Sequence, residues 1–156
     1  MVITQEKIYD LLEQVKDPEI PVLSISELGV LRDVKIEQDQ IIVTITPTYT
    51  GCPAMDMIRV NILAALEDAG YKNVKIKTIL SPPWTTEWMT EKGKDKMKKY
   101  GIAPPDSKII GVKDGVECPV CHSSNTVVIS AFGSTACKAL YRCKDCLEPF
   151  DYFKCH

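Results

Sequence analysis

Apolar and polar positions follow two different periods in the N-terminal part of the chain. Residues 30–36, 41–46 and 74–80 alternate with a period of two, which predicts three strands, the first two of them joined as an antiparallel hairpin. Residues 4–15 and the segment that follows Pro53 repeat apolar residues at spacings of three and four, which predicts helices. The order helix-strand-strand-helix-strand predicts a small two-layer α+β domain in which the helices cover one face of a sheet.

A cysteine lies in the predicted turn between the second strand and the helix after Pro53. A helix that begins there places the Cys52 thiol at its N-terminal end, where unpaired backbone N–H groups and the helix dipole favour a thiolate. This position predicts a lowered pKa for Cys52. An inert, buried thiol is the alternative, because free cysteine is among the residue types most often buried. Position alone does not decide between the two.

Two acidic residues flank a proline in the turn that ends the first helix. Asp17 and Glu19 lie on either side of Pro18, and Pro21 follows, so the helix cannot continue. Paired carboxylates can bind a cation or transfer a proton, but acidic residues beside proline also form ordinary turns. The residues alone favour the ordinary turn.

The chain changes character after a proline-rich segment. A further helix is predicted over residues 85–100, carrying Trp88, and residues 103–107 then have the composition of a linker. We therefore predict an α+β domain over residues 1–103 and a smaller module over residues 104–156. A module of this size needs a cross-link or a bound metal to be stable, because it contains few apolar residues.

Two C-x-x-C pairs in the module can supply this stabilisation. Each pair can form a thiolate knuckle, and four sulfurs at about 2.3 Å satisfy tetrahedral zinc. Strand-like segments between the pairs predict a small β-rich zinc ribbon whose metal is structural. Iron in the same sulfur cage is the main alternative, because tetrahedral sulfur suits both metals. The predicted ligands are Cys118, Cys121, Cys143 and Cys146.

Two further cysteines of the module leave its ligand set open. Cys137 or Cys155 can replace one of the four ligands, or the two can pair with each other, and the sequence does not decide. His122 directly follows Cys121 and is expected to lie on the surface of the knuckle.

Composition excludes several classes of function. The formal net charge of the 156 residues is −2, which argues against a general nucleic-acid partner. The N-terminus is polar where a secretory signal needs an apolar core, and no stretch is long and apolar enough to span a membrane. We therefore expect a cytoplasmic protein with neither a nucleic-acid nor a membrane partner, in which cysteine pairs bind metal rather than form disulfides.

Longer motifs resemble known families. The acidic turn at 17–19, the hairpin and the run at 46–53 resemble the signature of the small metal-sulfur cluster assembly domain family, which shares this α+β order. The runs at 81–86, 101–105 and 132–155 resemble the PaaD-type D subunits of the phenylacetyl-CoA epoxidase system. The two sets of motifs together cover nearly the whole chain.

The resemblance implies an accessory role in aerobic phenylacetate catabolism, with the reductase and oxygenase subunits of the epoxidase as partners. It implies help in building or inserting the iron-sulfur cluster of the reductase, with Cys52 as the key cysteine and Asp17 and Glu19 in the acidic turn beside it. One sulfur is too few to hold iron or a cluster stably. A homodimer, a small thiol, the cysteines of the client or Cys155 would then supply the others.

Three other functions remain open at this stage. The chain can be a non-catalytic scaffold that holds the epoxidase subunits together, or a general iron-sulfur cluster maturation factor. It can also be an enzyme with Cys52 as nucleophile, although both histidines lie in the second module and the nucleophile needs a base. The chain lacks the Glu-x-x-His pairs of a di-iron centre and the glycine-rich fingerprint of a dinucleotide site, so it resembles neither catalytic subunit.

Overall fold

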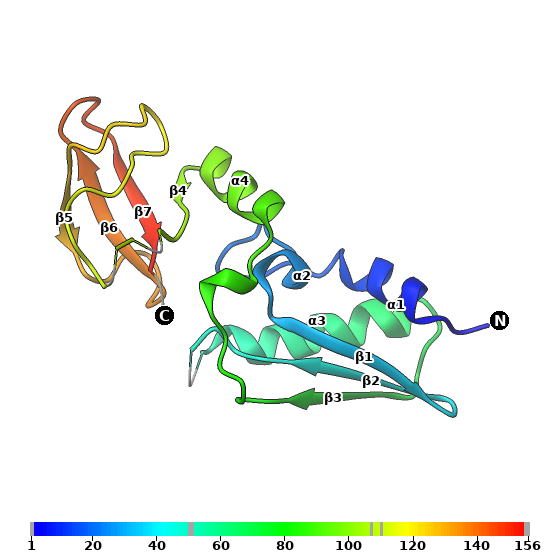
Figure 1. Ribbon diagram of the computed structural model, residues 1–156. Coiled ribbons are helices and arrows are strands. Elements are labelled where there is room, and N and C mark those ends of the chain that lie inside the picture. The colour runs from blue at the N-terminus through cyan, green and yellow to red at the C-terminus, as the bar shows by residue number, and fades with distance from the viewer. Residues whose placement is uncertain (1, 50–51, 107, 110, 155–156) are drawn as a thin grey trace. The chain divides into compact units, whose positions relative to one another are not determined.

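The chain folds into two compact units, which divide between Thr90 and Glu91. The structure is a computed structural model and describes residues 2–49, 52–106, 108–109 and 111–154 (Figure 1). Among these residues, no helix combines the length and the apolar character that a membrane crossing requires.

The first unit has the predicted α+β architecture. Its three-stranded sheet has the order β1-β2-β3, with β1 and β2 antiparallel and β2 and β3 parallel. The parallel pair arises because α3 crosses over between β2 and β3. The elements are α1 (Gln5–Leu12), α2 (Ile25–Leu28), β1 (Leu31–Glu37), β2 (Gln40–Ile45), α3 (Ala54–Asp68), β3 (Val74–Thr78) and the short 3-10 helix η1 (Thr86–Trp88).

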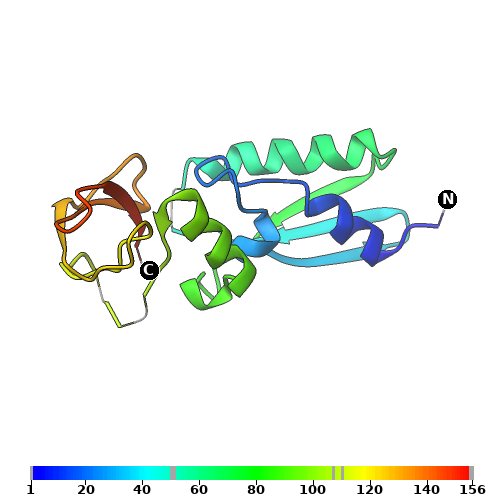
Figure 2. The ribbon, with the colours of Figure 1, turned by 90° about the horizontal axis from the view of Figure 1, so that it is seen from above.

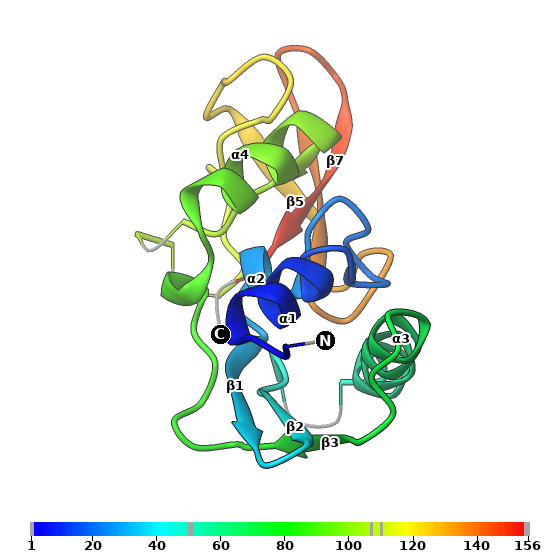
Figure 3. The same ribbon diagram turned by 90° about the vertical axis from the view of Figure 1, so that its right-hand side faces the viewer.

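The core of the first unit lies between its sheet and its helices. Ile41, Val43 and Ile45 alternate along β2 and are all buried, as the period of two predicts. Ile58 and Ile62 are buried on α3. Figure 2 shows α3 running lengthwise along the strands, and Figure 3 shows α1 and α3 on the same side of the sheet. The helices therefore cover one sheet face, and α3 is fixed to that face by its apolar side.

The second unit is a helix followed by a four-stranded sheet of order β4-β7-β6-β5. Its core contains Tyr141, whose ring stacks on Phe150 at 5.7 Å between centroids and meets Tyr152 edge-on at 5.4 Å. β5 and β6 match the strand-like segments predicted between the two cysteine pairs, whereas β4 and β7 were not predicted. The elements are α4 (Glu91–Tyr100), β4 (Ile102–Ala103), β5 (Thr126–Ser130), β6 (Lys138–Cys143) and β7 (Pro149–Phe153).

The single helix predicted over residues 85–100 is wrong, because η1 and α4 are separate elements. Met89 between them is extended, with φ −68° and ψ 139°. The Thr90 N–H donates to the carbonyl of Glu27 at 3.0 Å, and the Trp88 ring lies 3.5 Å from the guanidinium carbon of Arg32. These contacts hold the segment against the first unit and interrupt the helix.

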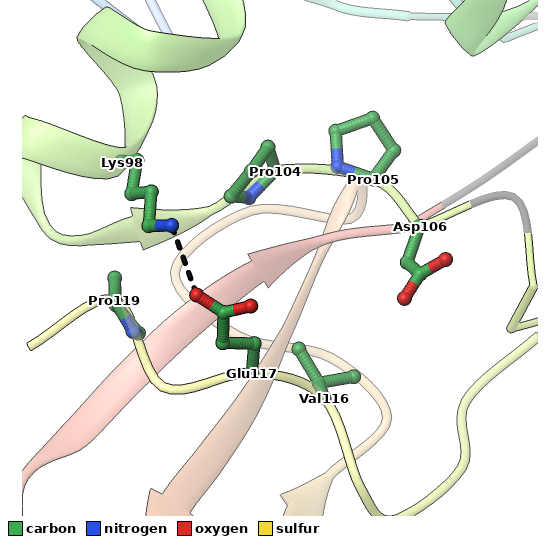
Figure 4. Close-up of a pocket in the computed structure, with 7 residues that line it drawn as sticks. All are labelled: Lys98, Pro104, Pro105, Asp106, Val116, Glu117 and Pro119. Carbon is green, nitrogen blue, oxygen red and sulfur yellow. Dashed lines mark hydrogen bonds and ion pairs between the residues drawn. The ribbon is translucent and has the colours of Figure 1, made fainter. Parts of the chain in front are cut away.

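Helix α4 belongs to the second unit, and the domain boundary between residues 103 and 104 stays a prediction. The Lys98 ammonium lies 2.9 Å from the Glu117 carboxylate and ties α4 to the loop that precedes the first cysteine knuckle. The proline-rich segment that suggested a linker follows α4 and contributes to a pocket of the same unit (Figure 4).

Candidate functional site

Cys52 lies in a turn that leads directly into α3. The Cys52 N–H donates to the Tyr49 carbonyl at 3.2 Å, and the Cys52 carbonyl accepts from the Met55 N–H at 3.3 Å. Pro53, with φ −68°, is the N-cap, and the helix begins at Ala54. The predicted helix start is therefore correct, and it leaves the Cys52 side chain half-buried at this end. Thr50 and Gly51 lie outside the described residues.

The environment of the Cys52 sulfur raises its pKa. Burial is the largest cause, and the negative charge of Glu19 also raises the pKa of the thiol. The Ala54 N–H and the hydroxyls of Tyr49 and Thr48 donate hydrogen bonds to the sulfur and lower the pKa, but they do not outweigh burial and Glu19. The predicted lowering of the Cys52 pKa is therefore wrong. The helix end does supply a donor, through Ala54, but the desolvation of a thiolate at this position costs more.

The two acidic residues of the turn have different positions. Asp17 is buried, and its carboxylate accepts hydrogen bonds from the N–H groups of Glu19 at 2.8 Å and Ile20 at 2.9 Å. It therefore closes the turn, as acidic residues beside proline commonly do. The Glu19 carboxylate acts electrostatically on Cys52, so the fold brings Glu19 and Cys52 together although they are far apart in the sequence.

Sequence reasoning missed the hydroxyls around Cys52. Thr48 is buried, and it and Tyr49 both donate to the sulfur. The signal was present in the sequence, because two hydroxyl side chains within four positions of a cysteine in a tight turn can reach its sulfur. Three donors and one carboxylate thus surround a thiol that is neutral at pH 7. The arrangement can stabilise a thiolate once a cation replaces the proton.

The four predicted ligands of the second unit lie together. Their sulfurs are all within 4.8 Å of one another, with 3.7 Å between Cys118 and Cys146 and 3.5 Å between Cys121 and Cys143. A tetrahedral ion with metal–sulfur bonds of about 2.3 Å requires sulfurs about 3.8 Å apart. The Cys146 N–H donates to the Cys143 sulfur and lowers the pKa of Cys143 to about 7. This four-cysteine site is therefore suited to hold a metal ion.

Cys137 and His122, whose side chains can also bind metals, lie outside the four-cysteine site. Cys137 is buried with its sulfur 3.0 Å from the Thr135 hydroxyl, outside the group of four. His122 is exposed, and its Nδ1 lies 3.0 Å from the Glu117 carboxylate. Cys155 lies outside the described residues, so the alternatives given for it stay open.

A pocket of about 250 Å³ opens beside the first knuckle of the second unit. Figure 4 shows the Lys98–Glu117 ion pair spanning it, with the ring of Pro119 at one side. The Lys98 ammonium, followed by His122, lowers the pKa of the Glu117 carboxyl. This pocket contains no thiol and is lined by Lys98, Pro104, Pro105, Asp106, Val116, Glu117 and Pro119.

Comparison with known proteins identifies the family. The model of the PaaD zinc beta ribbon domain matches residues 103–154, and that of the iron-sulfur cluster assembly protein family matches residues 5–77. An Escherichia coli (strain K12) protein, named as the D subunit of a "Putative 1,2-phenylacetyl-CoA epoxidase", is 47% identical over 151 residues, which cover 96% of this chain and 92% of the relative. The chain belongs to the PaaD family. The resemblance seen in its motifs is thereby confirmed.

Other relatives match only part of this PaaD-family chain. The "Fe-S protein maturation auxiliary factor" of Porphyromonas gingivalis (strain ATCC BAA-308 / W83) is 38% identical over 90 residues, which cover 56% of the chain and 85% of the relative. A crystal structure of the domain of unknown function DUF59 from Bacillus anthracis matches with a TM-score of 0.54 and 29% identity, over 58% of the chain and 87% of the structure. The α+β fold is thus known from crystallography.

Proposed function

We propose that this PaaD-family chain is an accessory subunit of the multicomponent phenylacetyl-CoA epoxidase in the cytoplasm. It assists the assembly of the iron-sulfur cluster of the reductase subunit, or its insertion, and its partners are the reductase and oxygenase subunits. The observation that carries this proposal is the Cys52 sulfur, which three hydrogen-bond donors and the charge of Glu19 surround. The names of the relatives, an epoxidase D subunit and an iron-sulfur maturation factor, support the same role.

The raised pKa of Cys52 suits a site that takes and releases iron. In the free chain the thiol is protonated. When Fe²⁺ or a cluster binds, an iron–sulfur bond replaces the S–H bond and the proton leaves to solvent. The Ala54 N–H and the two hydroxyls then donate to a thiolate, and the Glu19 carboxylate offers an oxygen ligand or a compensating negative charge. Asp17 contributes by holding the turn that carries Glu19.

Weak binding of iron or a cluster is an advantage for a protein that passes it to a partner. Clusters normally take four cysteine ligands, and the described turn at Cys52 supplies one. The remaining ligands come from the client that receives the cargo, so transfer completes a coordination sphere that this chain leaves incomplete. The four-cysteine site differs from Cys52, because it supplies all four ligands itself. We propose that it holds structural Zn²⁺, which stabilises the ribbon and takes no part in the transfer.

The proposal is tested by the 2Fe-2S content of the reductase after co-expression with this chain, with its Cys52→Ser variant, or with neither. Cys137→Ser is the matched control, because Cys137 is a thiol outside the four-cysteine site. We expect full occupancy with the unchanged chain and with Cys137→Ser, and low occupancy in the other two cases. Equal occupancy in all four samples would overturn the proposal.

A scaffold that holds the epoxidase subunits together is the second candidate. In a scaffold Cys52 stays a neutral thiol, which is a poorer ligand and nucleophile than a thiolate. The two functions differ in one result. A scaffold with an inert Cys52 retains full epoxidase activity in the Cys52→Ser variant but loses it when the chain is absent.

A further inference from the structure

The helix that follows Cys52 has a second apolar side that faces solvent. Met57 is 52% exposed, Val60 is 58% exposed and Leu63 is 42% exposed, and Ala64 beside them is also exposed. Their spacings of three and four place them together on one side of α3. We call Met57, Val60, Leu63 and Ala64 the outer stripe. Ile58 and Ile62, which are buried, lie on the opposite side of the same helix.

An outer stripe of this kind is unusual for a surface helix. Such helices place apolar residues toward the core and polar residues toward solvent, and a helix that is apolar on both sides is normally covered on both. Figure 3 shows α3 end-on at the margin of the first unit, with the other elements of that unit on one side only. Scattered exposed apolar residues need no explanation, but four on one helix side form a continuous patch.

Acidic residues border the outer stripe at both ends. Asp56 precedes Val60 by four positions, Glu67 follows Leu63 by four, and Asp68 follows Ala64 by four, and all three are exposed. Arg59, the one cation in the sequence of α3, has its guanidinium hydrogen-bonded to the Thr78 hydroxyl of β3. A partner that covers the stripe must therefore be apolar at its centre and carry Lys or Arg at its rim.

The size of the outer stripe indicates the kind of partner. From their exposed fractions, its four side chains expose about 300 Å² in total, at the lower end of the range for the largest apolar patch on a monomer. Two copies of the chain joined through this stripe would bury about 600 Å², well below the roughly 1,200–2,000 Å² of a stable interface. The stripe suits a transient partner better than a permanent dimer.

The position of the outer stripe indicates which transient partner this is. Met57 lies about one helical turn after the segment that carries Cys52, so a protein seated on the stripe also lies close to that segment. We propose that the outer stripe of α3 is the docking surface for the protein that receives iron from Cys52. This inference rests on the proposed function. The docking face of that client is apolar with a basic rim and lies beside its cluster-binding cysteines.

Binding of the purified apo-reductase to the full chain tests the inference. The variant is Val60→Gln, which removes the centre of the stripe and keeps a good helix former. The matched control is Leu80→Gln, because Leu80 is 61% exposed, lies in the same unit and is outside α3. We expect Val60→Gln to weaken binding about tenfold and Leu80→Gln to leave it unchanged. We also expect binding to weaken as salt concentration rises, because the acidic border contributes to it.

Two results would overturn the inference. In the first, Val60→Gln binds the reductase as tightly as Leu80→Gln does. In the second, light scattering shows that the unchanged chain is a dimer which Val60→Gln dissociates, so that a second copy covers the stripe. Repeating the measurement with Cys52→Ser separates this inference from the proposed function. Docking through the stripe persists in Cys52→Ser, whereas cluster transfer does not.

Discussion

Removal of the metal from the four-cysteine site is expected to unfold the sheet of the second unit and to leave the first unit folded. Three large rings, those of Tyr141, Phe150 and Tyr152, lie in the apolar core of the second unit. Full burial stabilises a side chain of this size by about 1.5–3 kcal/mol, so the rings contribute roughly 5–9 kcal/mol. Structural zinc contributes about 10–16 kcal/mol at pH 7, which is more than the three rings together. We therefore expect the metal to stabilise this unit more than these three rings do.

The assay is amide hydrogen exchange, strand by strand, before and after chelation of the metal. We expect the β6 amides to lose their protection and the β2 amides to keep it. Cys118→Ser, which removes one of the four sulfurs, should give the same pattern without a chelator. The fluorescence of Trp84, which is buried in the first unit, reports independently that this unit remains folded. Protected β6 amides in a chain shown by mass spectrometry to be metal-free would refute the reasoning.

Four further predictions concern the first unit. Alkylation of Cys52 by iodoacetamide should accelerate with pH around a midpoint above that of a free cysteine, and Glu19→Gln should lower this midpoint, because it removes a charge that disfavours the thiolate. The raised pKa also makes the contribution of Cys52 to the free energy of unfolding depend on pH. This contribution should be constant below about pH 8.5 and should decrease as pH rises toward the raised pKa of the folded state, as urea titrations at several pH values would show. Ile62→Ala should lower the free energy of unfolding by about 2–5 kcal/mol, because Ile62 is fully buried between α3 and the sheet, and a loss below 1 kcal/mol in urea would contradict this packing. Trp84→Phe should cost about 1–3 kcal/mol, since it leaves the Leu28 carbonyl without the indole N–H that lies 3.0 Å away, and an unchanged thermal midpoint would contradict this.

The sequence predicted those parts of the fold that depend on local periodicity. Ile41, Val43 and Ile45 alternate, and they form the buried side of β2. The proline and the spacing of apolar residues after Cys52 correctly placed the start of α3. The two C-x-x-C pairs indicated four sulfurs close together, because a two-residue spacer lets both sulfurs of a pair face one ion. Each of these features is encoded within a short segment.

Features that depend on contacts between distant segments were not predictable. The break at Met89 depends on contacts of its neighbours with the first unit, including the hydrogen bond from Thr90 to Glu27. The direction of the Cys52 pKa depends on how deeply the sulfur is buried and on the charge of Glu19, which the fold brings near. The periodicity of the sequence indicates neither the burial of the sulfur nor the nearness of Glu19. A helix end alone indicates a lowered pKa, and here burial reverses that effect.

Direct transfer of iron from Cys52 is the central claim, and cluster formation on the purified apo-reductase tests it most directly. The chain is loaded with Fe²⁺ and sulfide and mixed with apo-reductase in air, whose oxygen oxidises the two iron ions to the ferric state of the absorbing cluster, and a chelator selective for ferrous iron is present. The visible absorption of the 2Fe-2S cluster is followed with time. We predict that the unchanged chain and Cys137→Ser form the cluster despite the chelator and that Cys52→Ser does not. Equal cluster formation by Cys52→Ser and the unchanged chain would contradict the account.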